Sequence, residues 1–114
     1  MLEALFASVG LVARGPVAWK LDIPDTVPGV YVIVRDGEVV YVDHATRSLA
    51  RRLQELYRQQ HGPKALHQAG QDSLSLKTSL WVYWALTDEP RHVEAEMLRW
   101  LSRRCGYLPS GNRK

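Results

Sequence analysis

Two short runs of β-branched residues separated by a turn constrain this chain more than any other feature. The runs are Val30–Val34 and Val39–Val42, and the residues between them are Arg-Asp-Gly-Glu. An Asp-Gly pair between two such runs is the strongest short-range signal for an antiparallel hairpin. We therefore expect the chain to fold around a β-hairpin.

The register of this hairpin decides whether Tyr31 and Tyr41 share a face. A two-residue turn at Asp36-Gly37 pairs Tyr31 with Val42 and separates the tyrosines. A three-residue turn with a left-handed Gly37 and a bulge instead pairs Tyr31 with Tyr41. We expect the second because it gathers an all-valine face suited to a core: Val30, Val32, Val34, Val40 and Val42. The other face then carries Tyr31, Ile33, Val39, Tyr41 and Asp43.

Before and after the hairpin, apolar spacing predicts helices. Residues 2–9 predict a short helix that ends near Gly10, and residues 11–28, with three prolines and one glycine, predict a connecting arm. Residues 46–60 predict a helix with one apolar stripe. A polar loop is expected over 61–78.

The C-terminal third predicts one more strand and one more helix. Residues 79–86 are apolar on both faces, which is typical of a central strand. Pro90 is expected to begin a last helix that runs to about Arg104 and ends at Gly106.

The order of elements is β-β-α-β-α after an N-terminal helix and arm. Three strands are not stable alone, so helices must cover them. We predict an α/β protein of the α+β kind, a layered sandwich in which helices flank a small, three-stranded, mainly antiparallel sheet. With 114 residues, the chain forms one globular domain, with the arm at 1–27 and the functional unit at 28–114.

Composition limits the classes of function. The net charge of +3 is compatible with a polyanionic partner but does not require one. A single cysteine excludes a disulfide framework and a thiolate metal cluster. The sequence has no apolar run of membrane-spanning length and no basic leader, so we expect a cytoplasmic protein that does not contact membranes.

Basic residues are concentrated after the hairpin. They are a candidate nucleic-acid surface, or alternatively a solvated helix face: Arg47, Arg51, Arg52, Arg58 and Lys64. Arg52 falls at the border of the apolar stripe of the 46–60 helix, whereas Arg51 falls nearly opposite it. Arg52 is therefore the better candidate for a site beside the sheet.

The last helix places a carboxylate among apolar residues. Glu94 falls inside the stripe formed with Val93, Met97 and Leu101, whereas Glu96 falls outside it. A carboxylate in that position is costly unless a metal, a cation or hydrogen bonds satisfy it. Glu94 is therefore a candidate metal ligand, and pairing with an arginine is the structural alternative.

Five features in order along the chain resemble the GIY-YIG nuclease family. They are "GVY" at 29–31, "YVD" at 41–43, the spacing Leu49-x-x-Arg52, Glu94 at the start of a helix, and "LPSGN" ending at Asn112. The resemblance spans residues 28–113. Each tripeptide alone is a weak signal, and the ordered set is fairly specific.

The resemblance implies a metal-dependent endonuclease that hydrolyses phosphodiester bonds in DNA. It implies that Glu94 holds one divalent cation, Mg²⁺ or Mn²⁺, and that Arg52 stabilises charge on the phosphoryl oxygens. Tyr31 and Tyr41 would orient or deprotonate the attacking water, and Asn112 would help to fix the site. The implied partners are DNA and either a second copy of the chain or a larger repair or restriction complex.

Two positions depart from the family pattern. Asp43 stands where the second tripeptide has glycine, and His44 stands where a small polar or basic residue is usual. Asp43 has three interpretations: it is a second metal ligand, it pairs with Arg52 or Arg47 and blocks the site at rest, or it abolishes phosphate binding. The alternative function is a catalytically inactive module that binds nucleic acid or a protein partner.

Overall fold

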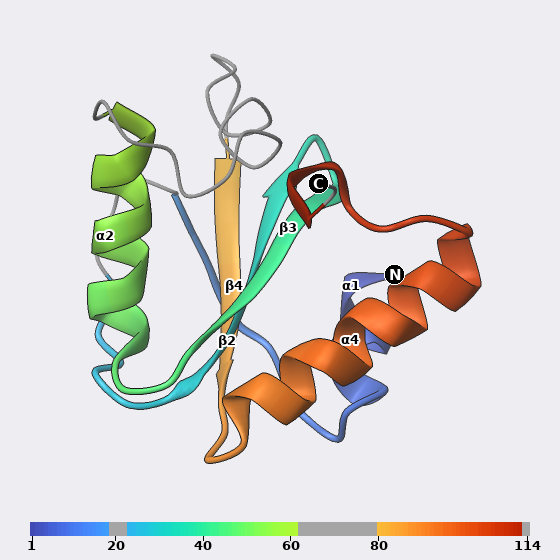
Figure 1. The fold of residues 1–114 in the computed structure, drawn as a ribbon, viewed down its shortest axis with the longest axis horizontal. Coiled ribbons are helices and arrows are strands. Elements are labelled where there is room, and N and C mark those ends of the chain that lie inside the picture. The colour runs from blue at the N-terminus through green and yellow to red at the C-terminus, as the bar shows by residue number, and fades with distance from the viewer. Residues whose placement is uncertain (19–22, 62–79, 113–114) are drawn as a thin grey trace.

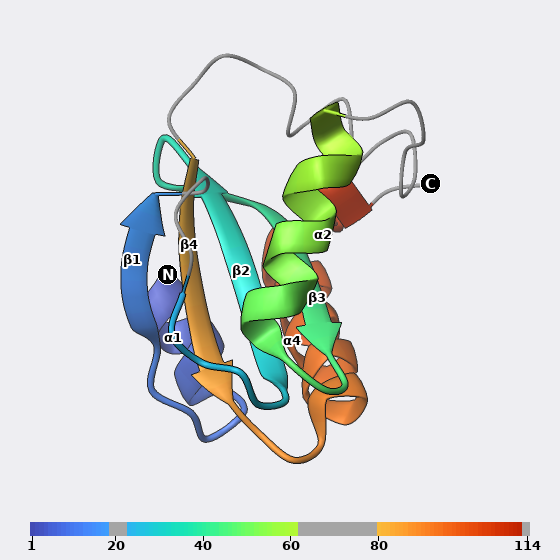
Figure 2. The same cartoon turned by 90° about the vertical axis from the view of Figure 1, so that its left-hand side faces the viewer.

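The computed structural model of the protein describes residues 1–18, 23–61 and 80–112. Four strands form one antiparallel sheet in the order β1-β4-β2-β3 (Figure 2). Their bounds are Arg14–Ala18 (β1), Gly29–Arg35 (β2), Glu38–Ala45 (β3) and Leu80–Leu86 (β4). The predicted α+β class is confirmed, and β4 is central as expected. The sheet has four strands where three were predicted.

Helices cover both faces of this sheet. Helices α1 (Leu2–Ala7) and α4 (Pro90–Cys105) lie on one side, and α2 (Leu49–His61) lies on the other (Figure 1). A short 3-10 helix, η1 (Ser110–Asn112), follows α4 and lies beside the edge strand β3. No described helix has the length and hydrophobicity needed to cross a bilayer.

The additional strand, β1, lies in the segment expected to be a connecting arm. It pairs with β4, and the register shifts between Arg14 and Val17. Proline lacks an amide hydrogen, so an edge strand such as β1 can contain Pro16. At Gly15 the backbone has a φ of +98°, and a Cβ would lie 2.7 Å from the Val82 carbonyl oxygen. Glycine and proline therefore mark an irregular edge strand here and not a loop.

The hairpin forms as predicted, but its turn and register differ. Asp36 and Gly37 both have positive φ, at 52° and 77°, and so form a two-residue turn. A register shift between Ile33 and Val34 then pairs Tyr31 with Asp43 and Ile33 with Tyr41. The predicted three-residue turn and the pairing of Tyr31 with Tyr41 are wrong.

The face assignment is nevertheless mostly correct. Tyr31 and Tyr41 lie on the same face because the observed register still pairs odd-numbered residues with each other. Val34 opposes Val39 while Ile33 opposes Tyr41, so Val40 is the extra residue of a β-bulge. Val40 therefore joins the face of the tyrosines, and Val39 packs against the other face.

Two apolar clusters hold the layers together. The α4-side cluster lies between the sheet and helices α1 and α4, and its fully buried members include Leu5, Phe6, Val30, Val32, Val42 and Met97. The α2-side cluster lies between the sheet and α2, and it includes Tyr31, Ile33, Val40, Tyr41, Leu49, Leu53 and Leu56. Each buried side chain of this size contributes about 1.5–3 kcal/mol.

The helix boundaries follow their capping residues. Helix α2 begins at Leu49, not at 46, and the Ser48 hydroxyl accepts a 3.2 Å hydrogen bond from the Arg51 amide in its first turn. Helix α4 begins at Pro90 and ends at Gly106, which has a left-handed φ of 80°, as predicted. The predicted loop at 61–78 lies almost wholly outside the described residues.

Candidate metal and phosphate site at the edge of the sheet

The candidate site lies at the end of β3, where two consecutive side chains reach opposite sides of the sheet. Asp43 contacts Arg52 of α2, and His44 contacts Glu94 of α4. Successive residues of a strand point to opposite faces, and β3 is an edge strand, so both helices can approach its end. The two positions that depart from the GIY-YIG pattern therefore connect the two helices.

Asp43 is the most connected side chain of the site. Its Oδ2 accepts hydrogen bonds from Arg52 Nη2 at 2.8 Å, from the Tyr31 hydroxyl at 2.9 Å and from the Tyr41 hydroxyl at 3.2 Å. Its Oδ1 accepts a 2.8 Å bond from the His44 amide. Burial acts to raise the pKa of Asp43, but the bond to Arg52 and its charge, with these other donors, hold that pKa below its usual value. Asp43 is therefore an ionised carboxylate.

The tyrosines are hydrogen-bond donors in this arrangement. Tyr31 is fully buried and Tyr41 is 3% exposed, and their ring centroids lie 6.4 Å apart. Burial, followed by the negative charge of Asp43, raises the pKa of both hydroxyls well above the usual value. Both phenols stay protonated at neutral pH, so they are suited to orienting Asp43 and unsuited to removing a proton from water.

Glu94 has a different environment from Asp43. It forms a short hydrogen bond with His44 Nδ1, and its side chain is 20% exposed. Burial raises the pKa of Glu94; the bond to His44 opposes this shift, and the negative charge of Asp43 adds to it. Glu94 lies on the border of the buried face of α4, and its hydrogen-bond partner is a histidine where an arginine was the structural alternative.

Asn112 fixes the backbone beside the site. Its Oδ1 accepts a 2.9 Å bond from the Val42 amide, and its Nδ2 donates a 2.8 Å bond to the Val42 carbonyl. The contact requires a close approach: a Cβ on Gly111 would lie 2.6 Å from the Val40 carbonyl oxygen and 2.8 Å from the Tyr41 ring. The sequence Gly111-Asn112 therefore lets η1 lie directly on β3.

Three side chains at this site have the types and the spacing of ligands for a divalent cation. Asp43, His44 and Glu94 each offer one ligand atom, and these atoms all lie within 4.8 Å of one another. Carboxylate oxygens suit Mg²⁺ and Mn²⁺, and an imidazole nitrogen suits transition metals. The described residues here fit a cation.

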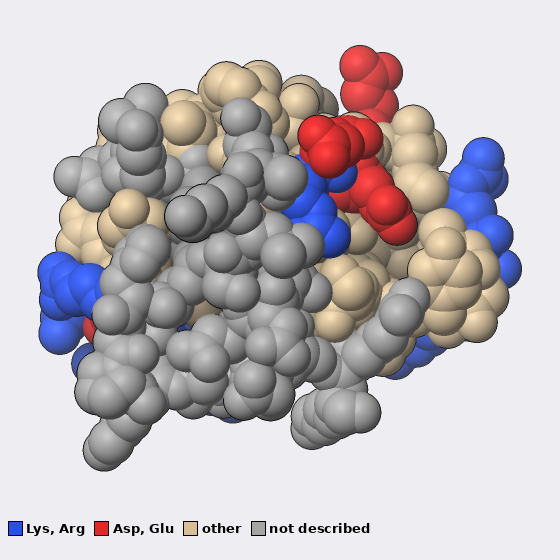
Figure 3. Space-filling view, turned by 90° about the horizontal axis from the view of Figure 1, so that it is seen from above, with Lys and Arg blue, Asp and Glu red and all other residues tan. Residues whose placement is uncertain are grey.

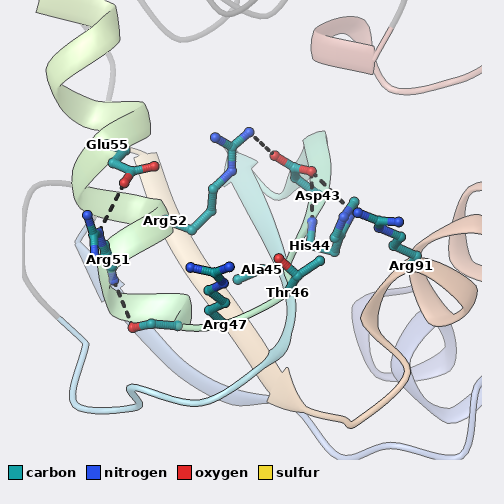
Figure 4. A pocket seen from close by; sticks show the side chains of 10 residues that line it. Asp43, His44, Ala45, Thr46, Arg47, Arg51, Arg52, Glu55 and Arg91 are labelled. Atoms are coloured by element: carbon teal, nitrogen blue, oxygen red, sulfur yellow. Dashed lines mark hydrogen bonds and ion pairs between the residues drawn. The ribbon is translucent and has the colours of Figure 1, made fainter.

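A hollow of about 480 Å³ opens between α2, the end of β3 and the start of α4 (Figure 4). Besides Asp43 and His44, the charged residues that line it are Arg47, Arg51, Arg52, Glu55 and Arg91. The hollow therefore offers guanidinium groups next to the candidate cation site. Lys or Arg atoms also lie against Asp or Glu atoms at the other end of the molecule, which is seen from above in Figure 3.

The predicted basic residues divide into three groups. Arg47, Arg51 and Arg52 line the hollow, although Arg51 is 80% exposed and pairs with Glu55 at 3.3 Å. Arg58 is exposed further along α2 and is not among the lining residues. Lys64 lies outside the described residues.

Sequence reasoning missed Arg91. It lies in the first turn of α4, beside His44 in Figure 4, and it lines the hollow. Residues three apart on a helix are neighbours, so its position three residues before Glu94 was the available signal.

Comparison with known proteins gives no match to a protein-family model, to a curated protein or to a solved structure.

Proposed function

We propose that the protein is a metal-dependent endonuclease of the GIY-YIG type that hydrolyses phosphodiester bonds in DNA. One observation carries the proposal. Residues matched to the family by short motifs, and separated by up to 81 positions along the chain, lie around the end of one edge strand: Tyr31, Tyr41, Arg52, Glu94 and Asn112.

Each of these residues has a role that its contacts support. Glu94 would hold the divalent cation, Mg²⁺ or Mn²⁺, which when bound polarises the phosphate and stabilises the leaving oxygen. Arg52 stabilises charge on the phosphoryl oxygens. Tyr31, Tyr41 and Asn112 are positioning residues: the tyrosines orient Asp43, and Asn112 holds Val42 next to it.

Arg52 can serve Asp43 and a phosphate together. Its bond to Asp43 uses Nη2, one of three nitrogens of a guanidinium with five N–H donors. Figure 4 shows this side chain extending from α2 across the hollow, towards Asp43. Arg47 and Arg91 line the same hollow and are suited to the phosphates that flank the reacting one.

Cleavage of a supercoiled plasmid with Mg²⁺, and then with Mn²⁺, tests the proposal. We expect nicking by the wild-type protein and a loss of at least about 100-fold in rate for Glu94→Gln. Glu96→Gln is the matched control, because Glu96 lies on the same helix and pairs with Arg99 on its exposed face. Equal nicking by wild type and Glu94→Gln would overturn the proposal.

One observation favours the second candidate, an inactive module that binds nucleic acid. The negative charge of Asp43 is bonded to the arginine that the first candidate requires for phosphate. If this pair blocks the site, the wild-type protein will bind DNA with salt-dependent affinity but will not cut it. Asp43→Gly would then gain nicking activity, because the substitution releases Arg52.

A further inference from the structure

We propose that Asp43, His44 and Glu94 form one three-ligand site, with two carboxylates and an imidazole, that prefers Mn²⁺ and the later first-row divalent metals to Mg²⁺. The inference deepens the proposed function, on which it rests for the role of the ion. The ligand set itself is defined by contacts alone. It differs from the single glutamate that the family resemblance implies.

The geometry of the three ligand atoms supports a shared ion. Asp43 Oδ1 lies 3.6 Å from His44 Nδ1, and all three ligand atoms lie within 4.8 Å of one another. Two adjacent ligands of one octahedral ion with bonds of about 2.1 Å are about 3.0 Å apart, so small side-chain movements bring these atoms onto one ion. His44 Nδ1 and Glu94 already share a hydrogen bond, so these two ligand atoms are direct neighbours.

Asp43 divides its two oxygens between the two sides of the sheet. Oδ2 accepts from Arg52, Tyr31 and Tyr41 on the α2 side, whereas Oδ1 lies towards His44. Ligating carboxylates are typically held by hydrogen bonds of this kind, which fix their orientation. Oδ1 is therefore a preorganised ligand atom.

The charge of the cluster also favours a cation. Two carboxylates meet here with a histidine between them, and Arg52 compensates only the charge of Asp43. A divalent ion would supply the remaining positive charge at the position where the ligand atoms converge.

The two arginines beside the cluster bear on what completes the site. Arg47 and Arg91 line the adjoining hollow, and their charge favours an anion next to the ion. A substrate phosphate fits there, and it is the usual additional ligand of Mg²⁺ and Mn²⁺ in phosphoryl-transfer sites.

The choice of metal follows from the nitrogen ligand. Mg²⁺ prefers oxygen ligands and retains its waters, whereas imidazole favours transition metals. The sequence departs from the family pattern at Asp43 and His44, and both residues contribute to the same cluster. A change of metal preference accounts for both departures together.

Titration calorimetry of the metal-free protein tests the site without measuring activity. We expect one Mn²⁺ per chain, bound at least about tenfold more tightly than Mg²⁺. His44→Asn should lower the Mn²⁺ affinity by about 10- to 100-fold and change the Mg²⁺ affinity little. His92→Asn is the matched control, because His92 is exposed on α4 and absent from the cluster. Thermal unfolding in EDTA checks that each variant is folded.

The outcomes separate this inference from the proposed function. Equal affinities for Mn²⁺ and Mg²⁺, unchanged in His44→Asn, would overturn the three-ligand site while leaving a Glu94-dependent nuclease intact. Absence of binding at millimolar metal would also overturn it and would make the cluster a proton-sharing network. Selective Mn²⁺ binding without plasmid nicking would support the site and reject the nuclease.

Discussion

The two faces of the sheet are built from different kinds of side chain. The buried residues of the α4-side cluster carry no hydroxyl, amide or charged group, and Val30, Val32 and Met97 are among the fully buried ones. The α2-side cluster contains Tyr31, Tyr41 and Trp84, and each of these carries a polar group to a carboxylate at the rim: the tyrosines to Asp43 and Trp84 to Asp25. The α4 side of the sheet therefore stabilises the fold by apolar packing, and the aromatic residues of the α2 side also orient charged side chains.

The same difference recurs within the candidate site. Asp43 faces the α2 side and accepts three hydrogen bonds on one oxygen, whereas Glu94 comes from α4 and has a histidine as its hydrogen-bond partner. The pKa of Asp43 is lowered and that of Glu94 is raised. The charge of Asp43 is therefore compensated within the protein, and Glu94 is the carboxylate that attracts an added cation more strongly.

The largest expected loss of stability comes from a substitution in the α4-side cluster. Met97 is fully buried, so Met97→Ala should lower the free energy of unfolding by about 2–5 kcal/mol. Met97→Leu, which conserves volume, should cost less than about 1.5 kcal/mol. Urea unfolding in EDTA measures both. If the comparison of the two faces is correct, Mn²⁺ affinity is unchanged in every folded variant; a tenfold loss would show that this face also shapes the site.

A smaller effect is expected on the polar side. Asp43→Asn leaves the partly buried guanidinium of Arg52 without a carboxylate and should cost about 2–3 kcal/mol, less than for a fully buried pair. A lowered pKa in the folded state stabilises the protein above the unfolded pKa, near 3.9, and this contribution is lost as pH falls below it. The difference from wild type in urea unfolding should therefore shrink below about pH 4. A difference that stays constant from pH 7 to pH 3 would contradict the ion pair.

The smallest expected loss of stability comes from removing the side-chain hydrogen bonds to the backbone of β3. Asn112→Ala removes two hydrogen bonds to Val42 and should cost about 1–2 kcal/mol. Amide exchange followed by NMR should show about tenfold faster exchange at Val42. Val32, which opposes Val42 on β2, is the internal control and should change less. Equal acceleration at both amides would indicate general loosening of the sheet.

Local signals predicted most of the fold. Proline and glycine predicted both ends of α4, β-branched runs predicted β2 and β3, and a run that is apolar on both faces predicted β4. The bulge at Val40 had no local signal, because it lies where Gly111, distant in the sequence, packs against the Val40 carbonyl. The edge strand β1 was missed because Gly15 and Pro16 usually interrupt strands, and only pairing with β4 shows that they do not.

The candidate site was predictable to the extent that it depends on helix faces. Arg52 at the border of an apolar stripe and Glu94 among apolar residues were both identified from helical spacing. The contact between His44 and Glu94 was not, because 50 residues separate them and strand alternation places His44 opposite Asp43. Because β3 is an edge strand, side chains from both faces of the sheet can meet at its end and form one cluster.

The amide of Asn112 also has a consequence for self-association. The N–H and C=O groups on the open side of an edge strand can pair with a strand of another molecule, and such edges promote aggregation. On β3, the Asn112 side chain forms hydrogen bonds with both the N–H and the C=O of Val42, and Asp43 Oδ1 accepts one from the N–H of His44. A second chain cannot extend the sheet across residues 42–44 without first breaking these bonds, so the segment that carries the site is protected from strand addition.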